Sequence, residues 1–113
     1  MTAALAARLE KAHEALDLTW RDLADSLDTT ERSVYRWKAG DVAPGPATRR
    51  RIEALLDLID LLEQTFDSPE EARAWLGSRV PALGNRSPFE LLKRGRIDEV
   101  RETLGRLAHG AFA

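Results

Sequence analysis

Apolar side chains recur at intervals of three and four residues along most of the chain, a pattern typical of amphipathic helices. The first such stretch predicts a helix over residues 3–16, with an inner face made of Leu5, Leu9, Ala12 and Leu16. The widest apolar stripe lies on a predicted helix over residues 47–65 and consists of Ile52, Leu55, Leu56, Leu58, Ile59, Leu61, Leu62 and Phe66. Because this stripe is so wide, we expect the helix to contact more than one neighbour.

Residues with capping chemistry lie between these stretches. Thr19 stands three residues before a carboxylate, which predicts a second helix from about Trp20. Thr30 is a suitable N-cap for a third helix that runs to Ala39. Gly40 then stands where the end of a helix needs a left-handed residue, and a loop with two prolines follows.

The second half of the chain uses one start sequence twice. Ser68-Pro69-Glu70-Glu71 and Ser87-Pro88-Phe89-Glu90 each combine an N-cap, a proline at the first helical position and a carboxylate. Gly95 is expected to end the second of these helices, and a last helix is predicted over residues 97–108. Its inward side chains are expected to be Val100, Leu104 and Leu107. Runs of β-branched residues are absent, so the predicted fold is all-α.

Composition excludes several classes of protein. A chain of 113 residues suits one compact domain or two small ones that share a core. It has no cysteine and only two histidines, far apart, which argues against a disulfide framework, a zinc site and a cysteine nucleophile. We find no nucleophile–base pair and no glycine-rich phosphate loop, so we expect no enzymatic activity, no cofactor and no metal. Without a long apolar run or a leader sequence, a soluble cytoplasmic protein with no membrane partner is expected.

Charge is distributed unevenly along the chain. Residues 53–71 contain seven carboxylates and neither Lys nor Arg, whereas the segment from Arg73 onward has eight basic residues against four acidic ones. Residues 17–51 are nearly neutral but hold Arg36, Lys38 and the triplet Arg49–Arg51. These regions are either ordinary solvated helix faces or surfaces for different partners.

The segment Leu18–Gly40 has the spacing of a helix-turn-helix, in which a small residue sits where two helices cross and the second helix is capped. The positions that carry this pattern are Leu23, Ala24, Thr30, Val34, Trp37 and Gly40. The segment resembles the Xre/Cro-like helix-turn-helix family, and the resemblance extends over residues 3–60. Two positions depart from the family pattern: Trp20 stands where Gln is frequent, and Asp28 stands where Gly is frequent.

Operator DNA is the partner that this arrangement predicts. Arg32, in the first turn of the recognition helix, is the best candidate to read a guanine edge. Glu31 either accepts a hydrogen bond from cytosine or simply suits the start of the helix. Arg36 and Lys38 are expected on phosphates, with Arg49–Arg51 either flanking them or forming an exposed helix start. The predicted DNA-binding side chains are Trp20, Arg21, Thr30, Glu31, Arg32, Tyr35, Arg36 and Lys38.

The last third of the chain resembles the toxin-binding domain of the Xre/MbcA/ParS antitoxins, from about Ala72 to the last residue. The matching positions are Trp75, Leu76, Pro81, Leu83, Gly84, Ser87, Pro88, Leu91, Leu92, Gly95, Val100, Gly110 and Phe112. The expected architecture is an N-terminal helix-turn-helix bundle, residues 1–66, joined by the long helix to a small helical toxin-binding domain, residues 67–113.

This resemblance implies an antitoxin that occludes a RES-domain toxin, an enzyme that degrades NAD, and that represses its own operon. The C-terminal end would then reach the toxin's cleft. The basic residues of this half either face the toxin or are solvated. The predicted toxin-binding residues are Arg79, Arg86, Lys93, Arg94, Arg106, His109, Gly110, Phe112 and Ala113. The alternative is a stand-alone helix-turn-helix regulator whose C-terminal domain only dimerises.

A homodimer is expected because helix-turn-helix proteins bind palindromic half-sites. The wide stripe from Ile52 to Phe66 is either the dimer surface or the core that joins the two halves of the chain.

Overall fold

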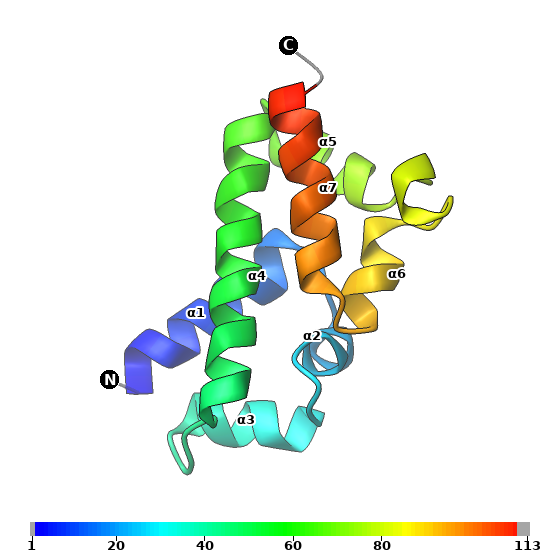
Figure 1. Ribbon diagram of the computed structural model, residues 1–113. Helices are drawn as coiled ribbons and strands as arrows, with labels where there is room; N and C mark the ends of the chain where they lie inside the picture. Colours follow the sequence, from blue (N-terminus) through cyan, green and yellow to red (C-terminus); the bar gives the residue numbers. More distant parts are fainter. Residues whose placement is uncertain (1, 111–113) are drawn as a thin grey trace.

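The computed structural model describes residues 2–110 and consists of helices and short connections (Figure 1). The helices are α1 (Thr2–Ala15), α2 (Trp20–Ser26), α3 (Glu31–Ala39), α4 (Pro46–Thr65), α5 (Pro69–Leu76), the 3₁₀ turn η1 (Pro81–Leu83), α6 (Pro88–Lys93) and α7 (Ile97–Gly110). Between residues 2 and 110 the only extended pairing is one isolated antiparallel bridge, Val80 to Arg86. The all-α prediction is confirmed.

The predicted helix starts are confirmed by their caps. The side-chain oxygens of Thr19, Thr30, Ser68 and Ser87 each accept a hydrogen bond from the backbone N–H three residues later, at 3.0, 3.1, 3.2 and 3.2 Å. Each bond satisfies an amide that the helix itself leaves without a partner. The local sequence therefore fixes where four of the helices begin.

The two residues that flank α3 with left-handed backbone are of types that tolerate this conformation. Gly40 ends α3 with φ of 82°, and Asp28, in the turn between α2 and α3, has φ of 58°. Asp28 is the residue that departs from the family's glycine, and aspartate is one of the few residues that tolerate this conformation. The turn between α2 and α3 therefore forms without a glycine at this position.

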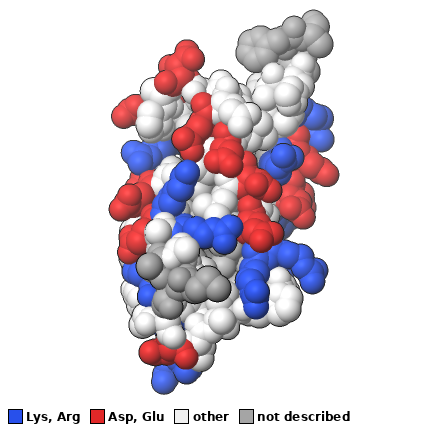
Figure 2. Space-filling view, turned by 90° about the vertical axis from the view of Figure 1, so that its left-hand side faces the viewer, with Lys and Arg blue, Asp and Glu red and all other residues white. Residues whose placement is uncertain are grey.

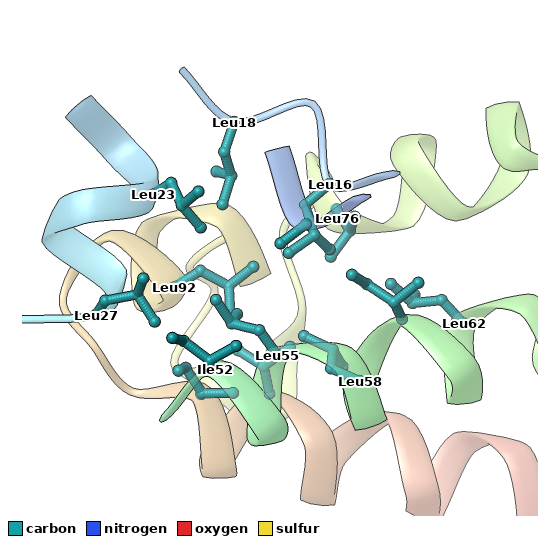
Figure 3. Packing of buried hydrophobic residues seen from close by; sticks show 14 of the residues in the cluster. Leu16, Leu18, Leu23, Leu27, Ile52, Leu55, Leu58, Leu62, Leu76 and Leu92 are labelled. Carbon is teal, nitrogen blue, oxygen red and sulfur yellow. The ribbon is translucent and has the colours of Figure 1, made fainter. Parts of the chain in front are cut away.

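The long helix α4 is the central helix of the molecule, and α1 and α7 both pack against it (Figure 1). Its inner side chains meet leucines from both halves of the chain in one buried cluster, including Leu16 and Leu23 from the first half and Leu76 and Leu92 from the second (Figure 3). Ile52, Leu55, Leu58, Ile59 and Leu62 are each at most 3% exposed within a single chain. These five side chains therefore form the core that joins the two halves, and they are not available as a dimer surface. Leu56, Leu61 and Phe66 of the same stripe are half-buried.

The end of α7 differs from its prediction. The helix continues to Gly110, two residues beyond the predicted end. Val100 and Leu104 are fully buried, but Leu107 is 37% exposed, so the expectation that it faces the core is wrong. By its spacing, Leu107 lies on the same side of α7 as Val100 and Leu104. It is exposed because the last turn of α7 extends past the buried cluster.

Candidate functional sites at the two ends of the molecule

Helix α3, the predicted recognition helix, is held by its inner face and presents its outer face to solvent. Val34 and Trp37 are buried against the core. On the other side Arg32 and Arg36 are exposed, and Tyr35 is 47% exposed. The Tyr35 hydroxyl donates to the Glu31 carboxylate at 3.4 Å, so these two predicted residues form one polar unit. Thr30, the N-cap of α3, lies at the start of this face, and its hydroxyl oxygen accepts a hydrogen bond from the Ser33 amide.

Two other predicted DNA ligands, Trp20 and Lys38, are engaged inside the protein. The Trp20 indole stacks on His13 with ring centroids 4.0 Å apart, and the Lys38 ammonium lies 3.7 Å from the Trp20 ring centroid. Because both groups approach the ring so closely, they occupy opposite faces of the indole. Lys38 also forms an ion pair with Glu10 at 3.0 Å, with 22% of its side chain exposed. The cluster ties α1 to the start of α2 and the end of α3.

Sequence reasoning did not identify His13 and Glu10, because their contacts join residues that are distant along the chain. The Nδ1 atom of His13 is buried and has no hydrogen-bond partner among the described residues. Nothing in the local sequence marks this pairing of α1 with Trp20. The one available sign was the unusual tryptophan at the start of α2.

Arginines from other elements flank α3. Arg21 is exposed on α2. The Arg49 Nε donates to the Pro44 carbonyl at 3.2 Å, which fixes this side chain across the loop after α3. A guanidinium nitrogen of Arg51 lies 4.0 Å from the Asp28 carboxylate, in the turn that precedes α3.

The predicted toxin-binding residues do not form one group. Lys93 and Arg94, at the end of α6, border a hollow that they share with the start of α3 and the turn before it. The Lys93 ammonium lies 4.0 Å from the Asp22 carboxylate of α2. Arg79 and Arg86 lie instead on the exposed turn around η1, where the Val80 N–H donates to the Arg86 carbonyl at 3.1 Å.

Three further members of that set, Arg106, His109 and Gly110, lie at the end of α7. Arg106 and His109 are exposed, and an Arg106 guanidinium nitrogen donates to the Thr103 hydroxyl at 3.3 Å. Gly110 is the last helical residue, and Phe112 and Ala113 lie outside the described residues.

Figure 1 shows α3 at one end of the molecule and the end of α7 at the other. The principal extents are 46 × 24 × 23 Å, so the two surfaces lie along the long axis. Figure 2 shows acidic and basic side chains interspersed on one flank between these ends. Within residues 2–110 no group of three potential metal ligands occurs, and no helix combines the length and apolarity that a membrane span requires.

Comparisons with known proteins identify the family. Residues 61–110 match the family model for the Xre/MbcA/ParS antitoxin C-terminal toxin-binding domain. The mycobacterial cidal antitoxin MbcA of Mycobacterium tuberculosis H37Rv is 32% identical over 96% of this chain and 95% of its own length. Antitoxin Xre of Yersinia enterocolitica is 32% identical over 73% of this chain and 57% of its own length. A crystal structure of the M. tuberculosis MbcT–MbcA toxin–antitoxin complex contains a similar chain, with a TM-score of 0.68 and 31% identity over 96% of this chain and 97% of that one.

The helical fold and these relatives define an antitoxin of a toxin–antitoxin system. The chain belongs to the Xre/MbcA/ParS antitoxin family. The matched segment begins at residue 61, inside α4, and not near Ala72 where the sequence resemblance was expected to begin. The earlier start has a structural basis, since Leu62 belongs to the buried cluster and Phe66 packs on Trp75 of α5 with ring centroids 6.1 Å apart.

Proposed function

We propose that this antitoxin binds and occludes a RES-domain toxin that degrades NAD, and that as a homodimer it represses its own operon by binding operator DNA. The observation that carries the proposal is the position of the two candidate surfaces at opposite ends of one continuous core (Figure 1). Such an arrangement allows one chain to hold DNA and toxin at the same time.

The outer face of α3 supports the DNA part of the proposal. Arg32 is exposed in the first turn, where side chains of a recognition helix reach base edges. An arginine fork matches the O6 and N7 acceptors of guanine. Arg36, one turn farther along the exposed face, and Arg21 on α2 are suited to phosphates. Trp20 and Lys38 act in this proposal by holding α2 and α3 in position, with their indole and ammonium groups directed to each other.

The end of α7 supports the toxin part. MbcA, the relative in the solved complex, is an antitoxin seen with its toxin MbcT. In the present chain Leu107 is a large exposed apolar side chain on the last turns of α7, beside Arg106 and His109. Apolar surface of this kind is stabilised when a partner covers it. We assign Arg79, Arg86, Arg106, His109 and the segment Gly110–Ala113 to the toxin surface.

Lys93 and Arg94 belong to the DNA side in this proposal. They border the start of α3, whereas the C-terminal end of α7 lies at the far end of the molecule. Basic side chains beside a recognition helix are suited to flanking phosphates.

The test uses two variants that separate the two activities. Arg32→Ala is expected to lose sequence-selective operator binding and to keep neutralisation of the toxin, measured as inhibition of NAD consumption. Leu107→Asp is expected to show the reverse. Full loss of both activities in either properly folded variant would contradict the separation, and a partner toxin without NAD-consuming activity would contradict the RES assignment.

A further inference from the structure

The loop between α3 and α4 has an exposed apolar side chain that the proposed contacts with DNA and toxin leave unexplained. Three large apolar side chains are prominently exposed among the described residues: Tyr35, Val42 and Leu107. Tyr35 lies on the outer face of α3, and Leu107 lies on the last turns of α7. Val42, 38% exposed, belongs to neither surface.

Val42 lies at the edge of a groove bounded by the start of α1, the end of α3, the loop over residues 40–45 and the start of α4. The apolar side chains that line it are Leu5, Trp37, Val42, Pro44 and Ile52. Trp37, Pro44 and Ile52 are mostly buried, so they form a fixed floor, while Val42 stands at the rim. The molecule thus presents an apolar projection beside an apolar hollow.

The charged rim of this groove is balanced. It carries two cations, Arg8 and Arg49, and two carboxylates, Asp41 and Glu53. A two-fold interface places the same patch of both copies face to face, so a patch of one sign would repel itself. Equal numbers of both signs allow each cation to face a carboxylate of the other copy. This self-complementarity favours a second copy of the chain as the occupant.

The position of the groove also suits a dimer that binds DNA. The loop follows directly after α3, a helix of nine residues, which is about 14 Å long at 1.5 Å per residue. Pairing through this loop brings the C-terminal ends of both α3 helices toward the two-fold axis and leaves their first turns on the outer sides. That arrangement is compatible with half-sites about 34 Å apart on one face of the duplex.

We propose that this groove is the homodimer surface, in which Val42 of each copy packs into the apolar hollow of the other. The inference rests on the dimer part of the proposed function and assigns it to named residues. It replaces the stripe on α4, which is buried inside the single chain.

The experiment is sedimentation equilibrium of the full-length antitoxin over a range of concentrations, for the wild type, Val42→Asp and Val42→Lys. Each substitution occurs twice in a two-fold interface, so a tenfold loss per contact weakens the dimer by about 100-fold. Both variants are expected to sediment as monomers where the wild type is a dimer. Two opposite charges are used so that a single new ion pair cannot account for the result.

Leu107→Asp is the matched control, because Leu107 is 37% exposed and Val42 is 38% exposed. It should dimerise as the wild type does. At a concentration at which the wild type is monomeric, the circular dichroism melts of all variants should agree within a few degrees, because dimerisation then adds nothing to the stability of any of them. A wild-type dimer that persists in both Val42 variants would overturn the assigned surface while leaving the dimer itself intact. A wild-type protein that is monomeric throughout would overturn the dimer as well, and neither result bears on toxin neutralisation.

Discussion

The two ends of the molecule are built differently. At one end, helix α3 is capped at its start, ends at a left-handed glycine and is held by buried Val34 and Trp37. At the α7 end, the helix runs past the buried cluster and leaves Leu107 exposed. The α3 surface is fully ordered by contacts within the chain, which suits the proposed contact with a DNA duplex. The second gains apolar burial only when a protein covers it.

The link between the two ends is a single core. Leu55 of α4 is 1% exposed and lies among leucines from both halves (Figure 3). The tight approach of the α6–α7 turn adds to this link: a Cβ atom added at Gly95 would lie 3.1 Å from an Arg51 guanidinium nitrogen. The two surfaces therefore belong to one folded unit.

The largest expected effect is a loss of stability caused by a substitution in the shared core. Leu55→Ala should lower the free energy of unfolding by about 2–5 kcal/mol, through lost burial and the cavity that remains. Because the core is shared, far-UV circular dichroism and tryptophan fluorescence should report one transition, shifted as a whole. Leu56→Ala, half-buried on the same helix, should cost less. Two separate transitions, only one of them shifted, would show that the halves unfold independently.

The next largest effect concerns the α7 end. Deleting residues 110–113 should leave folding and operator binding unchanged and weaken toxin neutralisation strongly. Burial of one Phe side chain, Phe112, contributes about 1.5–3 kcal/mol, which corresponds to about 10- to 150-fold in affinity. The measurement is toxin activity titrated with full-length and truncated antitoxin, beside an operator shift assay on both. Equal neutralisation by the truncated protein would assign the inhibition to the helical body instead.

A smaller effect concerns the α3 end. Arg32→Ala should cost about 1–3 kcal/mol and relax base preference at one operator position, because a bidentate contact to one base is lost. Arg36→Ala should weaken binding to all sequences alike. It should also reduce the slope of the logarithm of the binding constant against the logarithm of the salt concentration by about one. Binding-site selection on both variants checks this pair, and an unchanged preference in Arg32→Ala would remove Arg32 as a base reader.

The sequence predicted the parts of this structure that depend on local chemistry. The caps at Thr19, Thr30, Ser68 and Ser87 and the turn at Gly40 follow from a few neighbouring residues, and all are confirmed. The helical spacing of the apolar residues on α4 predicted which of its positions are buried. The two readings of the α4 stripe could not be separated, because periodicity shows that a face is apolar but not which partner covers it.

The candidate sites were harder to predict for the same reason. The engagement of Lys38 with Glu10 and Trp20 depends on α1 packing against α3, which no short motif encodes. The exposure of Leu107 depends on where the neighbouring helices stop. Lys93 and Arg94 belong by sequence to the toxin-binding segment, yet folding carries them to the start of α3.

The smallest expected effect decides to which end Lys93 and Arg94 belong. Replacing both by Ala should weaken operator binding modestly. The slope of the logarithm of the binding constant against the logarithm of the salt concentration should fall by up to about 0.9 for each lost phosphate contact. Toxin neutralisation should stay unchanged. Stability should change by no more than about 1 kcal/mol, since the Lys93–Asp22 pair is long, at 4.0 Å, and partly solvated.

The matched control is the double variant Arg79→Ala and Arg86→Ala, which removes the same charge from the exposed turn around η1. It should weaken toxin neutralisation and leave the salt dependence of operator binding as it is. Both measurements can be made on the same preparations, by operator titration at several salt concentrations and by inhibition of the toxin. If the Lys93 and Arg94 variant instead loses neutralisation and keeps its operator affinity and salt dependence, the end of α6 belongs to the toxin surface. The two surfaces would then not be confined to opposite ends of the molecule.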